Sequence, residues 1–174
     1  MALYKVEVKA ELGGVTDLQP ANARDYIWTV DAECSKCPAQ DRKPFTVNVG
    51  SGGAETTIEC SGCDHSGSIA IVEIPPKQIG GKRGQFINPY SAKGYDDEWE
   101  TLVVFKVNGI TPLECRTPEA WVAVGSKSKK EINDITLDWN GDWFGYDAAA
   151  EVTVKVLSFE LKLQKIAKKE LAVQ

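Results

Sequence analysis

The chain has 174 residues, an apolar fraction of 43% and a formal charge of −5. This length suits one domain or two small lobes with an ordinary core, and no apolar run approaches the roughly 18 residues that a membrane span needs. Phosphate contacts rely on excess positive charge, so a net acidic chain is a poor candidate for binding nucleic acid. We therefore expect neither a membrane nor a nucleic-acid partner.

The first predicted strand covers residues 4–12, where polar and apolar residues alternate. This segment lacks the apolar core of a signal peptide, which favours a cytoplasmic protein. Further β-type runs are separated by glycine, proline, asparagine and aspartate. They lie at 26–33, 44–49, 55–59, 68–74, 99–107, 119–124, 132–139 and 151–163. The pattern predicts a mostly β, sandwich-like fold. The one helix candidate is 163–171, with a frayed extension as the alternative.

Four of the five cysteines form two pairs with the spacing C-x2-C-x22-C-x2-C. Two residues between thiolates let one tight turn present both sulfurs to a single metal. Because cytosolic thiols stay reduced, such pairs indicate metal ligands rather than disulfides. Soft sulfur ligands favour zinc, with iron in a rubredoxin-like site as the alternative. We predict one Zn²⁺ per chain, held in two zinc knuckles by Cys34, Cys37, Cys60 and Cys63.

Four thiolates leave no open coordination position, which favours a structural metal over a catalytic one. His65 is the single histidine, and we expect it on the surface of a loop; replacing a ligand or moving a proton are the alternatives. Cys115 has no local partner, and we expect it to pack as a small apolar residue rather than to act as a reactive thiol. These residues predict a protein that is not an enzyme.

An internal repeat relates the two halves of the chain. At an offset of 95 residues, the segment Gly14–Leu18 matches Gly109–Leu113 at four positions. A tryptophan follows in each half, Trp28 and Trp121. Cys34 lies six residues after Trp28, and Lys127 lies six residues after Trp121. In the same count Lys130 takes the position of Cys37.

The repeat predicts a duplication into two similar β-sandwich-like lobes. An N-terminal lobe, 1–90, would bind zinc, and a C-terminal lobe, 91–174, would lack the ligands and carry a C-terminal extension. Chance similarity between two strand–turn units is the alternative.

The order of these pieces resembles the eukaryotic family of CXXC-motif-containing zinc-binding proteins. Besides the cysteine pairs, the resemblance rests on the segments 14–20, 87–90, 109–112, 134–137 and 143–147. It implies two related β-rich lobes with pseudo-twofold similarity and one zinc in the N-terminal lobe. It also implies that Cys34, Cys37, Cys60 and Cys63 are the ligands.

The function expected from these features is a monomeric protein-interaction module supported by its zinc. The alternative is a thiol redox or zinc-transfer protein that uses the CxxC pairs. An aromatic segment, Trp139–Tyr146, is a candidate surface for a protein or peptide, with packing as its alternative. The segments 75–85 and 163–174 are further candidates for binding a partner. The alternative is that they are an ordinary loop and tail.

Overall fold

The computed structural model describes residues 1–37, 42–49, 55–74, 84–92 and 98–167. These ranges contain twelve strands, and no helix is assigned within them. The strands are β1 (Ala2–Gly13), β2 (Val15–Pro20), β3 (Trp28–Cys34), β4 (Lys43–Val47), β5 (Thr56–Glu59), β6 (Ser66–Val72), β7 (Glu100–Asn108), β8 (Ile110–Cys115), β9 (Trp121–Gly125), β10 (Glu131–Ile135), β11 (Trp143–Asp147) and β12 (Val152–Lys165). The prediction of a mostly β chain is confirmed.

The helix predicted for 163–171 is wrong over its described part, because β12 continues to Lys165. Pairing with β1 holds this segment extended, from Tyr4 opposite Lys165 onward. Residues 75–83 and 168–174, which include most of the two candidate partner segments, lie outside the described residues. In the ranges that are described, nothing helical has the length and apolar character of a membrane span.

Each predicted β-type run overlaps a strand, but β2, β8 and β11 were not predicted. Two of them begin directly after single glycines with positive φ, Gly14 at 72° and Gly109 at 67°. Glycine adopts this conformation without the penalty that a Cβ brings. Since one residue makes each corner, no loop of turn-forming residues separates β1 from β2 or β7 from β8.

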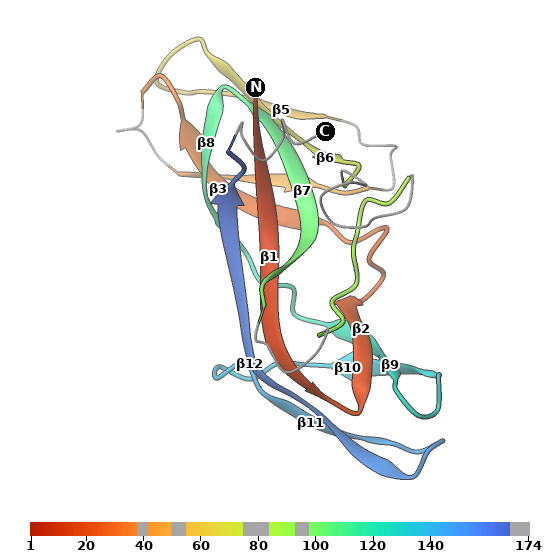
Figure 1. The fold of residues 1–174 in the computed structure, drawn as a ribbon. Coiled ribbons are helices and arrows are strands. Elements are labelled where there is room, and N and C mark those ends of the chain that lie inside the picture. The colour runs from red at the N-terminus through yellow and green to blue at the C-terminus, as the bar shows by residue number, and fades with distance from the viewer. Residues whose placement is uncertain (38–41, 50–54, 75–83, 93–97, 168–174) are drawn as a thin grey trace.

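The strands form three sheets, and strands from both predicted halves pair in each of them (Figure 1). The six-stranded sheet has the order β11-β12-β1-β7-β6-β5, and the three-stranded sheets have the orders β10-β9-β2 and β4-β3-β8. The predicted boundary between 90 and 91 therefore does not separate the sheets. Two independent lobes stay a prediction, whereas the shared pairing is observed.

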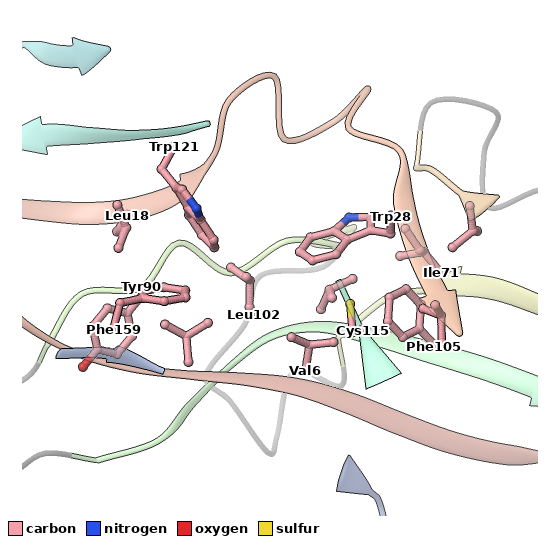
Figure 2. Close-up of a cluster of buried hydrophobic side chains, with 14 of the residues drawn as sticks. Val6, Leu18, Trp28, Ile71, Tyr90, Leu102, Phe105, Cys115, Trp121 and Phe159 are labelled. Atoms are coloured by element: carbon pink, nitrogen blue, oxygen red, sulfur yellow. The ribbon is translucent and has the colours of Figure 1, made fainter. Parts of the chain in front are cut away.

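Both repeat-related tryptophans are fully buried in one core that draws on strands from the whole chain. Figure 2 shows Trp28 and Trp121 to either side of Leu102. The Trp28 ring meets Phe105 edge-on at 6.2 Å, and Trp121 meets Phe159 at 4.9 Å between ring centroids. Because these tryptophans open β3 and β9, the core fixes the two strands that lead into the turns described below.

Candidate metal centre

Two turns carry the four cysteines, and each turn is fixed by a strand. Cys34 ends β3, which pairs with β4 on one side and β8 on the other. Cys60 follows β5 directly, and its N–H donates to the carbonyl of His65 at 2.8 Å, which closes the turn into β6. The N–H of Ser35 donates to the carbonyl of Gly109 at 3.2 Å. The backbone thus sets the positions of the sulfurs.

The structure brings together the four cysteines that the spacing singled out. All four Sγ atoms lie within 4.8 Å of one another. The distance is 3.7 Å from Cys34 to Cys63, 3.3 Å from Cys37 to Cys60 and 3.4 Å from Cys37 to Cys63. A tetrahedral zinc with bonds of about 2.3 Å places its sulfurs about 3.8 Å apart. The set therefore fits zinc after shifts of about half an ångström.

Backbone N–H groups favour thiolates at two of these positions. The N–H of Gly62 donates to Cys60 Sγ at 3.4 Å, and this bond is the main reason that the pKa of Cys60 falls to about 6. The N–H of Lys36 lowers the pKa of Cys34 in the same way. The pKa of Cys37 is raised, because its thiol hydrogen bonds with Cys60 and Cys63 favour its protonated form. A bound zinc would displace the remaining protons and link both turns through thiolates.

His65 differs from the surface residue that was predicted. Its side chain is half-buried, and its Nε2 is enclosed without a hydrogen-bond partner among the described residues. The ring lies against Gly109, where a Cβ would collide with Nε2 and with the backbone oxygen of Ser66. It takes no part in the sulfur cluster.

The cavity beside the cluster is small. It measures about 20 Å³ and is lined by residues that include Cys34, Cys60 and His65. This volume holds about one water molecule, which is too little for an organic substrate.

Cys115 lies apart from the cluster and is buried on β8. Burial raises the pKa of its thiol to about 12, with smaller contributions from Asp31 and Glu114. The thiol is therefore protonated at neutral pH, and the prediction that Cys115 packs as an apolar residue is confirmed.

The aromatic segment does not behave as one unit. Trp139 is 93% exposed, Phe144 71% and Tyr146 58%, whereas Trp143 is half-buried. Phe144 and Tyr146 share one face of β11, since side chains alternate along a strand. These three exposed side chains, Trp139, Phe144 and Tyr146, are called the aromatic surface below. For them the packing alternative does not hold.

Comparisons with known proteins agree with this site. The sequence matches the family described as "CXXC motif containing zinc binding protein, eukaryotic" over residues 5–164. It is 23% identical to UPF0587 protein F46B6.12 of Caenorhabditis elegans, covering 90% of each chain. It is 24% identical to UPF0587 protein CG4646 of Drosophila melanogaster, covering 97% of this chain and all of the relative.

Two solved structures share the fold. The crystal structure of C1orf123 has a TM-score of 0.70 at 25% identity, covering 94% of this chain and 98% of the other. A hypothetical protein from Plasmodium falciparum has a TM-score of 0.69 at 18% identity, covering 94% and 100%; this second likeness concerns the fold alone. With the match over nearly its whole length and the clustered cysteines, the chain belongs to the eukaryotic family of CXXC-motif-containing zinc-binding proteins.

Proposed function

We propose that the protein is a non-enzymatic interaction module whose single zinc is structural. The closed set of four thiols carries this proposal, because an ion bound by all four has no position left for water or substrate. The ion would join the turn after β3 to the turn after β5. We also propose that the protein is a monomer and that it is cytoplasmic, where thiols stay reduced and available to a metal.

Metal content and thiol protection test the structural role. Protein purified without added metal should contain one zinc per chain, measured by elemental mass spectrometry. Its four site thiols should resist alkylation until the protein is unfolded. Substoichiometric metal with native-state alkylation of Cys60 would contradict the proposal.

The aromatic surface is the proposed contact with a protein partner. Trp139, Phe144 and Tyr146 expose large rings to water, and such rings are frequent anchors of interfaces. β11 is an outer strand of the six-stranded sheet. Its outer edge pairs with no strand among the described residues. An extended segment of the partner would pair with this backbone edge while its side chains meet Phe144 and Tyr146.

Matched variants test this contact. Trp139→Ala, Phe144→Ala and Tyr146→Ala together should lose a partner that the unmodified protein retains in a pull-down, with an unchanged melting temperature. Ile27→Ala with Leu113→Ala is the control, since both side chains are exposed and apolar and neither belongs to the aromatic surface. Equal retention by both variants would exclude the aromatic surface as the contact.

A thiol redox or zinc-transfer protein is the second candidate. The low pKa of Cys60 and the partial exposure of all four site cysteines favour it, because accessible thiolates exchange and react more readily. Zinc exchange with a fluorescent chelator separates the two functions. Exchange within minutes supports transfer, and exchange over many hours supports the structural role.

We further propose that the chain arose by internal duplication. The strand order supports this, because replacing each strand of β1–β6 by its counterpart in β7–β12 turns the six-stranded order into its own reverse. The same exchange converts the order β4-β3-β8 into β10-β9-β2. The six-stranded sheet would then have its pseudo-twofold axis between β1 and β7.

A further inference from the structure

The duplication proposed above makes a specific claim about residues, because strand pairing aligns the two halves position by position. In the first half, Cys34 lies opposite Ile110 on β8. In the second half, Gly125 lies opposite Val15 on β2. Val15 and Ile110 are counterparts in the repeat, so Gly125 is the counterpart of Cys34.

Equivalent hydrogen bonds in the two halves support this register. The N–H of Ser35 donates to the carbonyl of Gly109, and the N–H of Ser126 donates to the carbonyl of Gly14, at 3.2 and 2.9 Å. Both acceptors are the corner glycines of the repeat. Counting onward, Ser128 is the counterpart of Cys37. The correspondence with Lys127 and Lys130 predicted from sequence is therefore shifted, and both lysine side chains are exposed.

The second cysteine pair has counterparts in the turn after β11. Ile69 lies opposite Val107 on β7 and opposite Thr56 on β5. Val156 likewise lies opposite Leu12 on β1 and opposite Trp143 on β11. Since Leu12 and Val107 are counterparts in the repeat, Thr56 corresponds to Trp143. Four residues further on, Asp147 is the counterpart of Cys60, and Ala150 is the counterpart of Cys63.

The two turns also share their hydrogen bonding. In the metal turn, Cys60 Sγ accepts the N–H of Gly62 at 3.4 Å. In the other turn, Asp147 Oδ1 accepts the N–H of Ala149 at 3.2 Å and that of Ala150 at 3.3 Å. A carboxylate oxygen therefore occupies the place of a thiolate against the same backbone N–H group.

The remaining oxygen of Asp147 points to the place where the other turn meets it. Asp147 is 3% exposed, and its Oδ2 is buried with no hydrogen-bond partner in the part of the chain that the structure describes. A Cβ built on Gly125 would collide with both this oxygen and Ser128 Oγ. The two oxygens thus converge beside Gly125, as the sulfurs converge beside Cys34.

We infer that the turns Gly125–Ser128 and Asp147–Ala150 form a second, degenerate metal site with the backbone of a four-thiolate zinc site. Ser128 and Asp147 supply two oxygens, fewer than the three or four protein ligands that hold zinc. In the natural chain Asp147 Oδ2 and Ser128 Oγ lie between the turns, beside Gly125. With thiols at the four positions, the same backbone binds zinc tetrahedrally.

The test restores the four ligands in the full-length chain. The variant Gly125→Cys, Ser128→Cys, Asp147→Cys, Ala150→Cys should bind two zinc ions per chain by native mass spectrometry, twice the content of the unmodified protein. Its Co²⁺ form should show twice the thiolate absorption per chain. The matched control is the variant Lys127→Cys, Lys130→Cys, Asp147→Cys, Ala150→Cys. It should bind no more zinc than the unmodified protein.

A folded four-cysteine variant without the additional zinc would overturn the inference, as would a control that gains zinc equally. The readout is the gain over the unmodified protein, so it is separate from the test of the first site. A second variant covers the case of misfolding. Ser128→Cys with Asp147→Cys matches Cys37 and Cys60, whose sulfurs lie 3.3 Å apart.

The double variant should form a disulfide between the two turns under mild oxidation, found by peptide mass spectrometry. Lys130→Cys with Asp147→Cys is its control and should stay reduced. Disulfide formation in the control but not in the Ser128 variant would reject the register, whatever the outcome with the four-cysteine variant.

Discussion

The turns after β3 and β5 lie at one end of the molecule, and the turns after β9 and β11 lie at the other (Figure 1). Four sulfurs gather at the first end, whereas at the second end oxygens of Asp147 and Ser128 lie beside Gly125. The strands that lead into both ends have the same order and equivalent pairing. The difference teaches that one backbone arrangement can carry either a set of metal ligands or two side-chain oxygens between its turns. Dependence on zinc should therefore be local to the first end.

Zinc removal should have the largest effect, and this effect should be confined to the end of the molecule that carries the four cysteines. Structural zinc contributes on the order of 10 kcal/mol to folding, so chelation should abolish hydrogen-exchange protection at the end of β3 and in the β5–β6 hairpin. Protection in β9 and β11 should persist, because no ion holds their turns. Exchange measured by mass spectrometry before and after chelation checks this, and equal loss of protection at both ends would contradict it.

The two corner glycines should differ in their tolerance of alanine. Both have positive φ, which by itself costs an alanine about 1 kcal/mol. At Gly14 the new Cβ would meet Val154 Cγ1 at 3.0 Å, whereas at Gly109 it would meet the backbone oxygen of Ser66 and the ring of His65. Because backbone yields less than a methyl group, overpacking at Gly109 should add about 1–3 kcal/mol.

Urea unfolding of Gly14→Ala and Gly109→Ala, both loaded with zinc, measures this difference. A cost at Gly14 equal to that at Gly109 would show that the contacts do not distinguish the two corners.

Trp28 and Trp121, which open β3 and β9, offer a finer comparison. The Nε1 of Trp121 donates to the carbonyl of Pro118 at 2.9 Å, while the buried Nε1 of Trp28 lacks a partner within the described ranges. Changing each tryptophan to phenylalanine should therefore cost about 1–2 kcal/mol more at Trp121, since a buried carbonyl loses its donor only there. Denaturant unfolding checks the order, and a larger loss for Trp28→Phe would refute the assigned hydrogen bonding.

Cys115 should give the smallest effect, visible only at alkaline pH. Its folded pKa is raised to about 12 from an ordinary value of 9.0. A raised pKa contributes stability that is complete below the unfolded value and is lost as pH rises toward the folded value. Between pH 9 and pH 10 this loss amounts to about 1 kcal/mol. The difference in unfolding free energy between the unmodified protein and Cys115→Ala should shrink over that interval. A constant difference would rule out a shifted thiol.

Local patterns made parts of this protein predictable. The alternation in 4–12 predicted β1, and the cysteine spacing predicted a cluster that the structure forms. Spacing suffices there because one tight turn fixes both members of each pair. β2 and β8 were missed because single glycines make their corners, and β11 was missed because its aromatic residues resemble a loop patch as closely as an edge strand.

The sequence by itself determined the β-rich class, the corner glycines and the four thiols, since each depends on neighbours along the chain. Only the tertiary structure decided that β2 pairs with β9 and β3 with β8, and that Trp121 is buried while Trp139 is 93% exposed. These facts depend on the register between strands far apart in sequence. A shift of one residue in such a register moves every side chain to the other face, and no local pattern specifies it.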